Sequence, residues 1–256
     1  MSLSFSVITA SYNRVGTLAQ ALDSVQGQQG VGVEHIVIDG GSTDGSLELL
    51  RSRPLPPAVL VSEPDSGIYD ALNKGLQRAT GAVVGFLHSD DWLAHPRVLE
   101  RVAAAFADPA VEAVYGDLDY VSADGGRVIR GWRSGAFEPV RLAAGWMPPH
   151  PTLYLRREVY QRLGGFDTGF QISADYEFML RLLGPGPGGS VRPAYLPEVL
   201  VKMRWGGASN RSLGRLIRKS REDYTALRRH GVGGLGTLLR KNLSKLPQFF
   251  KGDAPL

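Results

Sequence analysis

The sequence contains no cysteine, which excludes disulfide bonds and thiolate metal sites. No apolar run approaches the roughly 18–20 residues that a membrane-spanning helix needs. No basic region precedes the first apolar segment, so we expect no signal peptide. These absences together fit a reducing compartment, and we expect a cytoplasmic protein.

Two glycine-rich phosphate-binding motifs are also missing. The turn after the first apolar segment, residues 11–16, reads SYNRVG and lacks the Gly-x-Gly-x-x-Gly of dinucleotide-binding proteins. No Gly-x-x-x-x-Gly-Lys-Ser/Thr occurs anywhere in the chain. The sequence therefore disfavours a dinucleotide dehydrogenase, and any phosphate is expected to bind through a metal ion rather than a glycine cradle.

What is present is the composition of an ordinary globular protein, with 256 residues of which 43% are hydrophobic and 21% are charged. Four short apolar segments are separated by stretches with helical spacing, which predicts an α/β fold with a right-handed, mostly parallel sheet. They are residues 4–10, 35–39, 58–61 and 82–87.

Each apolar segment is followed by a polar cluster. The carboxyl ends of parallel strands lie at one edge of a sheet, where open α/β sheets bind their ligands. We therefore expect the clusters at residues 9–13, 39–44, 63–70 and 88–91 to converge there. The last cluster contains Asp90 and Asp91, and paired carboxylates suit Mg²⁺ or Mn²⁺ held against a diphosphate. A solvated turn is the alternative, because Asp is common in loops.

The second half of the chain carries different patterns. Residues 112–121 and 127–132 flank a Gly-containing turn, which predicts a hairpin and hence a mixed sheet. Pro148, Pro149 and Pro151 predict an extended segment that presents His150 rather than burying it. Asp175 falls in the first turn of a predicted helix, where the helix dipole favours a negative charge.

Four motifs occur in order: TASYN at residues 9–13, DGGSTDG at 39–45, DSGIYDALNKG at 65–75 and SDD at 89–91. In this combination the sequence resembles a family 2 glycosyltransferase with the GT-A fold, of the bacterial branch that builds surface and capsular polysaccharides. The resemblance implies metal-dependent transfer of a sugar, with inversion, from a nucleotide-diphosphate donor to an acceptor hydroxyl.

On the donor side, the resemblance implies that Asp39 accepts a hydrogen bond from the base and that Thr9 and Tyr12 line the base pocket. Asp90 and Asp91 would hold the ribose and the divalent ion. The other donor-side candidates are Asn13, Asp65, Asp70 and Lys74. An ordinary turn residue is the alternative for Asp39, and an i,i+4 helix pair is the alternative for Asp70 and Lys74.

One position departs from the family pattern. Many relatives carry an Asp two places before the first Asp of the pair, and this chain has His88 there. Imidazole binds Mn²⁺ but suits Mg²⁺ poorly. We therefore expect His88 to pack or hydrogen-bond rather than to bind the metal.

On the acceptor side, the resemblance assigns Asp175 the role of the base that takes the proton from the acceptor hydroxyl. Relatives often show Glu-Asp at this point, whereas this chain has Ala174 before Asp175, and Glu177 is the second candidate. His150 stands in a Pro-His pair that borders the acceptor, with a structural histidine as the alternative. Arg204 precedes glycines that would let a loop close over the donor, and it is a candidate contact of the diphosphate.

The net charge of +4 is unevenly placed, because a basic segment with helical spacing follows Asn210. A basic amphipathic segment can lie on an anionic membrane, at the inner face of the cell membrane, near a glycan or lipid-linked acceptor. The alternative is a helix that packs its apolar side on the domain. No aromatic-and-basic recognition pattern accompanies the charge, so we expect no nucleic-acid partner.

The sequence thus predicts a GT-A-type, Rossmann-like fold with helices on both faces of a mostly parallel sheet, a mixed second half and a helical tail. We expect a nucleotide-sugar-binding half at residues 1–115, an acceptor-binding half with the base at 116–209, and a basic tail at 210–256. A nucleotidyltransferase remains as an alternative, although it would normally show a Gly-rich basic loop after the first strand. A non-catalytic sugar-nucleotide-binding protein is the other.

Overall fold

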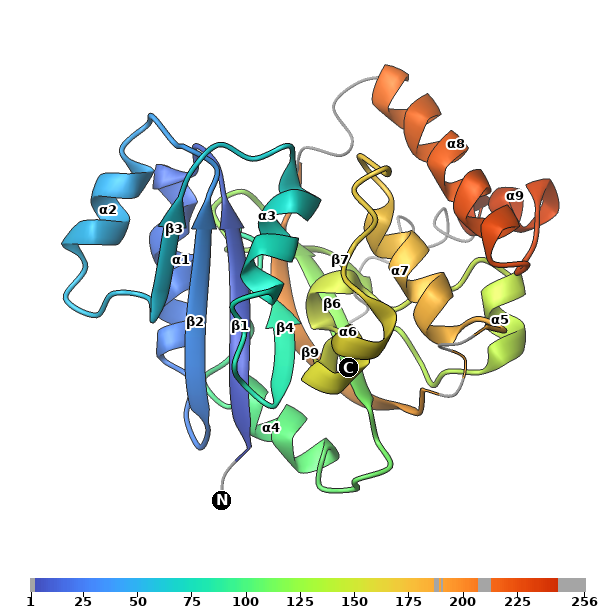
Figure 1. Ribbon diagram of the computed structural model, residues 1–256, viewed down its shortest axis with the longest axis horizontal. Coiled ribbons are helices and arrows are strands. Elements are labelled where there is room, and N and C mark those ends of the chain that lie inside the picture. Colours follow the sequence, from blue (N-terminus) through green and yellow to red (C-terminus); the bar gives the residue numbers. More distant parts are fainter. Residues whose placement is uncertain (1–2, 187–188, 190, 207–212, 244–256) are drawn as a thin grey trace.

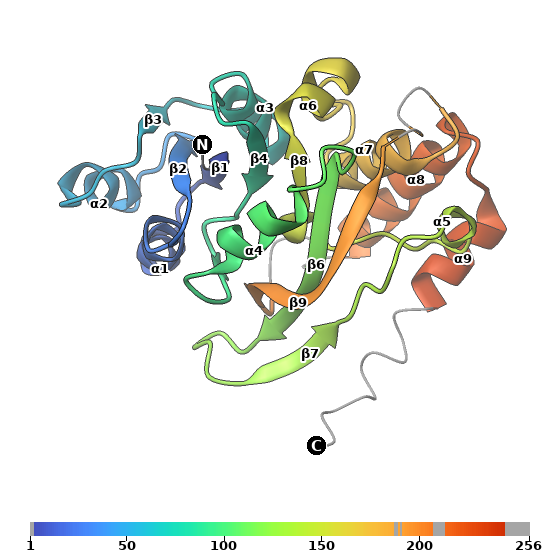
Figure 2. The same cartoon turned by 90° about the horizontal axis from the view of Figure 1, so that it is seen from below.

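The computed structural model describes residues 3–186, 189, 191–206 and 213–243. Within them one nine-stranded sheet runs in the order β3-β2-β1-β4-β8-β6-β9-β5, with β7 paired to β6. Figure 2 shows how this sheet curls from β2 round to β7. The strands are β1 (Ser4–Ser11), β2 (Gly32–Asp39), β3 (Val59–Ser62), β4 (Val83–Phe86), β5 (Asp91–Leu93), β6 (Ala113–Val121), β7 (Val128–Trp132), β8 (Tyr154–Arg156) and β9 (Pro193–Arg204).

Helices cover both faces of the sheet, as the sequence predicts. The alternation of the strands explains this, because Val7 and Ile8 point to opposite faces and belong to two different cores. Figure 1 shows α3 and α6 in front of the sheet and α1 behind it. The helices are α1 (Val15–Gln26), α2 (Ser46–Ser52), α3 (Ile68–Leu76), α4 (Val98–Ala105), α5 (Pro139–Ala143), α6 (Arg157–Leu163), α7 (Ala174–Leu183), α8 (Leu213–Arg229) and α9 (Leu235–Leu243), with a 3-10 helix, η1 (His150–Thr152).

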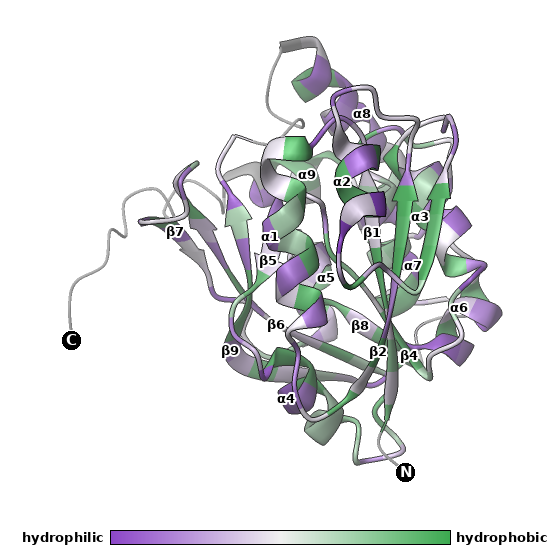
Figure 3. Cartoon of the chain, turned by 90° about the vertical axis from the view of Figure 1, so that its left-hand side faces the viewer, coloured by the Kyte–Doolittle hydropathy of each residue, from purple (hydrophilic) through white to green (hydrophobic). Residues whose placement is uncertain are grey.

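The first four strands form the predicted parallel sheet. β1 lies between β2 and β4, and β2 pairs with β3, all in parallel. Their residues are apolar and mostly buried, and Figure 3 shows the central strands largely in green while the helices carry purple outer faces. The carboxyl ends of these strands therefore share one edge, which positions the candidate site.

The second half is mixed, as predicted. β8 runs antiparallel between β4 and β6, and the β6–β7 hairpin is antiparallel with a register shift after Tyr120. β9 pairs in parallel with β6, and β5 pairs antiparallel with β9 so that Asp91 faces Met203. The domain boundary expected at residue 115 falls inside β6, and both halves share the one sheet.

The basic tail begins with α8, whose Ala226 and Leu227 are fully buried in the core that also holds α7. The first turns of α8 differ, because Leu216 and Ile217 are more than half exposed. Residues 207–212, part of the loop expected to close over the donor, and residues 244–256 of the predicted tail lie outside the described residues. None of the described helices is long and apolar enough to cross a membrane.

Candidate active site

The loops that follow β1 and β2 are joined by hydrogen bonds at the carboxyl edge. The backbone N–H of Asn13 donates to Ser42 Oγ at 2.8 Å, and Asn13 Oδ1 accepts from the backbone N–H of Thr43 at 2.9 Å. Asn13 has a φ of 51°, a left-handed conformation that Asn tolerates better than most residues. The first two predicted clusters therefore meet.

Asp39 ends β2 and is fully buried. Its Oδ2 accepts hydrogen bonds from the backbone of Gly41 and Ser42 and, at 2.8 Å, from Ser62 Oγ at the end of β3. Asp39 thereby holds its own loop against the neighbouring strand. Its expected hydrogen bond to a nucleotide base stays a prediction.

Thr9 and Tyr12 occupy contrasting positions. Thr9 is fully buried, and its hydroxyl lies 3.0 Å from His35 Nε2 inside the sheet, so it does not reach the surface of the edge expected to bind the base. Tyr12 is 59% exposed, beside Gly40. A Cβ on Gly40 would stand 2.4 Å from the Asp65 carboxylate, so any other residue here would displace the Asp65 side chain.

Asp70 and Lys74 form the i,i+4 pair that the sequence left open, with Lys74 Nζ 3.4 Å from Asp70 Oδ2. Lys74 also lies 2.9 Å from Glu63 Oε1. The backbone N–H of Ser66 donates to Asp70 at the start of α3, and this hydrogen bond lowers the pKa of Asp70. Both side chains therefore brace the β3–α3 loop, whatever they contribute to the donor.

Asp90 and Asp91 follow β4 at the same edge, but their surroundings differ. The Asp90 carboxylate is 29% exposed and lies 3.9 Å from Arg14 Nε in the loop after β1. Asp91 is 1% exposed, and within the described part of the chain neither carboxylate oxygen has a donor in hydrogen-bonding geometry. Burial and the neighbouring Asp90 raise the pKa of Asp91 well above its usual value, although the Arg204 backbone and guanidinium partly offset this.

Arg204 holds this acidic loop from β9. Its Nη1 donates to the Asp90 carbonyl at 2.6 Å, and its Nε donates to the Ala123 carbonyl at 3.1 Å. The guanidinium also stacks 4.6 Å above the Trp92 ring. These contacts give Arg204 a supporting role, and its expected contact with the diphosphate stays a prediction.

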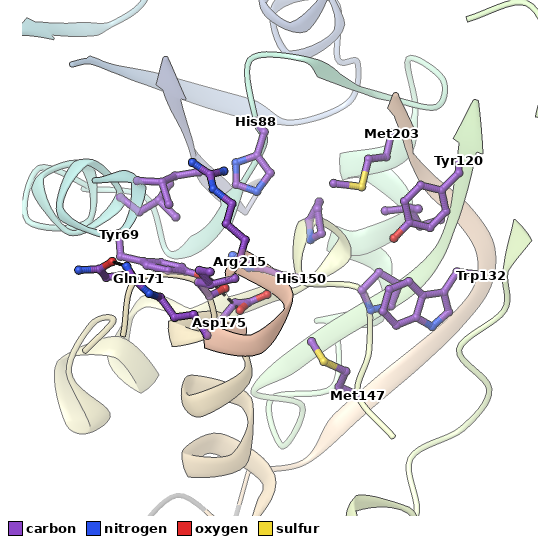
Figure 4. A pocket seen from close by; sticks show the side chains of 17 residues that line it. Tyr69, His88, Tyr120, Trp132, Met147, His150, Gln171, Asp175, Met203 and Arg215 are labelled. Carbon is purple, nitrogen blue, oxygen red and sulfur yellow. Dashed lines mark hydrogen bonds between the residues drawn. The ribbon is translucent and has the colours of Figure 1, made fainter. Parts of the chain in front are cut away.

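A pocket of about 430 Å³ opens beside this edge (Figure 4). Figure 4 shows Asp175 and Tyr69 on one wall and Tyr120 and Trp132 on the opposite wall. Tyr69 Oη lies 3.1 Å from Asp175 Oδ1 and 2.7 Å from the Ile172 carbonyl. The pocket is lined by Ile68, Tyr69, Leu72, His88, Leu118, Tyr120, Trp132, Met147, Pro149, His150, Pro151, Gln171, Ile172, Asp175, Met203, Arg215 and Arg218.

The expectation that the prolines present His150 to solvent is wrong. His150 begins η1 and is only 9% exposed, because its ring stacks on Phe86 at 5.5 Å and meets Phe166 edge-on at 5.4 Å. It nevertheless lines the pocket, and its Nε2 has no hydrogen-bond partner among the residues that the structure describes. Burial lowers the pKa of His150 to about 4, so the ring is neutral at pH 7.

His88 lies next to His150, with ring centroids 5.9 Å apart. Burial lowers the pKa of His88, while the carboxylates of Asp90 and Asp175 oppose the shift. His88 therefore interacts electrostatically both with the acidic loop after β4 and with the candidate base on α7. It packs beside His150 between the two groups, and the expectation that it does not bind the metal stays a prediction.

Glu177 is wrong as a second candidate for the base. It is 2% exposed and lies on the opposite side of α7 from the pocket lining. Arg181 donates to its Oε2 at 2.9 Å, and His230 Nε2 lies 2.8 Å from its Oε1. Burial alone would raise the pKa of Glu177, but these two partners outweigh it and lower the pKa. Glu177 therefore ties α7 to the end of α8.

Sequence reasoning missed the contribution of α8 to this pocket. Arg215 and Arg218 line it, and Glu222, one to two turns later, binds the segment that leads into α7. The only signal in the sequence was a pair of acidic residues, Glu222 and Asp223, within a strongly basic helix. That signal does not reveal which loop Glu222 contacts.

A sequence model of glycosyl transferase family 2 matches residues 6–173. The chain belongs to this family. Among curated relatives, it is 35% identical over 192 residues to an uncharacterized glycosyltransferase of Mycobacterium tuberculosis (strain H37Rv), covering 69% of this chain and 67% of the relative. It is 27% identical over 180 residues to chondroitin synthase of Pasteurella multocida, covering 69% of this chain and 18% of that enzyme.

Solved structures share the fold of this family 2 glycosyltransferase. S. aureus TarS 1-349 in complex with UDP superposes with a TM-score of 0.66 at 17% identity, over 97% of this chain and 73% of that one. The mannosyltransferase PcManGT from Pyrobaculum calidifontis, in complex with GDP-Man and Mn²⁺, gives 0.63 at 20% identity, over 98% and 76%. The chain spans about half of a longer TarS structure. These matches establish the GT-A fold.

The residues of this family 2 glycosyltransferase fit a divalent ion whose ligands come partly from the protein and partly from a substrate. The described residues contain no group of three or more His, Asp or Glu side chains able to enclose a metal by themselves. Asp91 offers two buried oxygens without donors, which is the environment a cation would stabilise. Mg²⁺ in such sites binds one or two carboxylates and completes its shell with phosphates and water.

Proposed function

We propose that this family 2 glycosyltransferase transfers a sugar from a nucleotide-diphosphate donor to an acceptor hydroxyl, with a divalent metal and with inversion. The observation that carries the proposal is the placement of Asp175 in a pocket that also contains His88, next to Asp90 and the buried, unsatisfied Asp91. Binding groups for a diphosphate and a base for a hydroxyl then stand on either side of one histidine. The nucleotide-bound TarS and PcManGT structures support a nucleotide sugar as the donor.

The donor lies, in this proposal, along the edge built by Asn13, Asp39, Asp65 and Asp90. Tyr12 offers an exposed ring on which a base can stack. Asp91 and Asp90 would hold a Mn²⁺ or Mg²⁺ ion, which would offset negative charge on the departing diphosphate. The Mn²⁺ in the PcManGT complex supports this assignment.

The transfer needs one proton acceptor. Asp175 takes the proton from the acceptor hydroxyl while the hydroxyl oxygen forms a bond to the anomeric carbon of the donor sugar. The bond between that carbon and the diphosphate oxygen breaks at the same time. The Tyr69 hydroxyl, 3.1 Å away, fixes the orientation of the carboxylate. His150 presents a neutral Nε2 that can hydrogen-bond a substrate hydroxyl.

The acceptor in this proposal is a glycan or a lipid-linked glycan, made for polysaccharide or glycolipid synthesis. Relatives named for PGL/p-HBAD biosynthesis, 32% identical over 181 residues, support the lipid-linked form. So do the apolar wall of the pocket and the exposed Leu216 and Ile217 on α8, which stand among arginines. Such a surface can bind an anionic membrane.

Two measurements test the proposal. Calorimetry against UDP, GDP, dTDP and CMP, each with and without Mn²⁺, should show metal-dependent binding of at least one nucleotide. With the matching nucleotide sugar, Asp175→Asn should keep nucleotide affinity and lose turnover. Glu158→Gln is the matched control, because Glu158 is also an acidic residue in a first helical turn but is exposed and away from the pocket. Unchanged turnover in Asp175→Asn would show that the base is wrongly assigned.

A further inference from the structure

The carboxylate of Glu222, on α8, accepts hydrogen bonds from three consecutive backbone N–H groups. Gln171 donates to Oε1 at 3.1 Å, and Ile172 and Ser173 donate to Oε2 at 2.8 and 2.9 Å. A charged acceptor makes stronger hydrogen bonds than a neutral one. One side chain from a distant helix therefore fixes three successive peptide units.

These peptide units form the entry to α7. Ser173 is the N-cap residue of that helix and makes no side-chain capping hydrogen bond, so Glu222 supplies from outside the negative charge that a helix N-terminus favours. Asp175 is the second residue of α7. Any movement of the segment at residues 171–173 is therefore transmitted to Asp175.

The same segment contacts the pocket directly. Gln171 and Ile172 line it together with Asp175, and the Ile172 carbonyl lies 2.7 Å from the Tyr69 hydroxyl that also approaches Asp175. Glu222 thus holds the backbone segment that leads into Asp175. The same segment contacts Tyr69, the partner of Asp175, through the Ile172 carbonyl. Glu222 acts from outside the pocket, because it is not a lining residue.

The part of α8 that carries Glu222 is held in place by a buried ion pair. The next residue, Asp223, is 1% exposed and lies 2.8 Å from the buried Lys241 of α9 and 3.1 Å from Lys219 of α8. Burial would raise the pKa of Asp223, but the two lysines outweigh it and lower the pKa, so the ion pair is kept at neutral pH. This buried pair joins α8 to α9, and the Lys241 ammonium also lies over the Tyr176 ring of α7.

We propose that Glu222 is a positioning residue for Asp175. α8 lies outside residues 6–173, the part of the chain that the family model matches. The inference rests on the proposed function, because it takes Asp175 as the base. Glu222 does not touch the reacting atoms, and it acts by holding the segment that carries the base.

The test compares Glu222→Gln with Arg221→Gln, which changes an exposed neighbour on the same helix. Turnover is measured as nucleotide release from UDP-GlcNAc, UDP-Glc, GDP-Man and dTDP-Glc, with water or octyl glucoside as acceptor. Glu222→Gln should lower kcat by about tenfold to a hundredfold, since a displacement of ~1 Å has that effect. Its Kd for the nucleotide with Mn²⁺ should stay within about twofold of wild type, whereas Arg221→Gln should change neither quantity.

Amide hydrogen exchange gives a second readout. Exchange at residues 171–173 should accelerate in Glu222→Gln and not in Arg221→Gln. Glu222→Asp, which keeps the charge on a shorter side chain, should restore part of kcat and serves if Glu222→Gln does not fold. Wild-type kcat in a folded Glu222→Gln protein would overturn the inference alone. A wild-type protein that releases no nucleotide from any donor and binds none of the nucleotides with Mn²⁺ would overturn the proposed function, and this inference with it.

Discussion

The substitution Asp91→Asn should raise the stability of the metal-free protein and weaken its stabilisation by a metal ion. The wild-type carboxylate is 1% exposed, and among the described residues neither oxygen has a donor in hydrogen-bonding geometry, although the Arg204 backbone and guanidinium act on it. A buried charged group left unsatisfied costs about 1–3 kcal/mol or more. Replacing it by a neutral amide of the same shape should therefore stabilise the metal-free protein by about that amount.

For a chain of this length, 1 kcal/mol corresponds to about 2–4 °C in Tm. We expect Asp91→Asn to raise Tm by about 2–12 °C at pH 7 in the presence of a chelator. The pKa of Asp91 is raised in the folded protein. Protonated Asp91 therefore contributes to folding stability fully only below the ordinary pKa of an aspartate, and this contribution is lost as the pH rises. The advantage of the variant should therefore shrink as the pH approaches about 4.

Mn²⁺ together with the nucleotide diphosphate should reverse the order. A ligand at about 100 times its Kd stabilises the wild-type protein by about 2.7 kcal/mol, and the variant should gain little. Thermal unfolding with and without Mn²⁺ measures both effects, and Asp90→Asn serves as the comparison because Asp90 is partly exposed. A lower Tm for metal-free Asp91→Asn, or equal stabilisation of both proteins by Mn²⁺ and nucleotide, would refute the reasoning.

Two further predictions follow from burial and exposure. Because burial lowers the pKa of His150 to about 4, the folded state binds fewer protons than the unfolded state between about pH 6.5 and 4, and stability falls as the pH is lowered through this window. His150→Phe should flatten the loss by up to about 1.4 kcal/mol per pH unit, measured by urea unfolding, and an unchanged slope would contradict it. Replacing Leu216 and Ile217 by Asp should weaken flotation with phosphatidylglycerol vesicles by about tenfold or more, while Leu55→Asp, equally exposed on another face, should not. Equal flotation of all three proteins would rule out a membrane contact through α8.

The sequence predicted the parts of the molecule that depend on local pattern. Strands such as β1 and β4 are short apolar runs with polar ends, and parallel pairing of consecutive βα units brings those ends to one edge. The meeting of Asn13 with the loop after Asp39, and of Arg14 with Asp90, follows from that topology. The ordered motifs were sufficient to indicate the family.

Contacts between distant segments could not be predicted in the same way. Glu177 resembles a second acidic residue at a helix start, but its partner His230 lies 53 positions away. His150 is flanked by prolines that favour extended backbone, yet stacking on Phe86 and Phe166 buries it in a 3-10 turn. No local sequence pattern around Glu222 indicates its contact with residues 171–173. In each case a tertiary partner decided the outcome over the local preference.

The unbroken sheet has a consequence for how this enzyme can accommodate its substrates. Because β6 pairs with β8 and β9 across the middle of the molecule, rotating one half against the other would rupture backbone ladders rather than bend a linker. Hinge closure of two lobes is therefore not available to it. Adjustment to donors and acceptors of different size must come from the rim, where the loops and the side chains of the pocket can rearrange while the strands beneath them stay fixed.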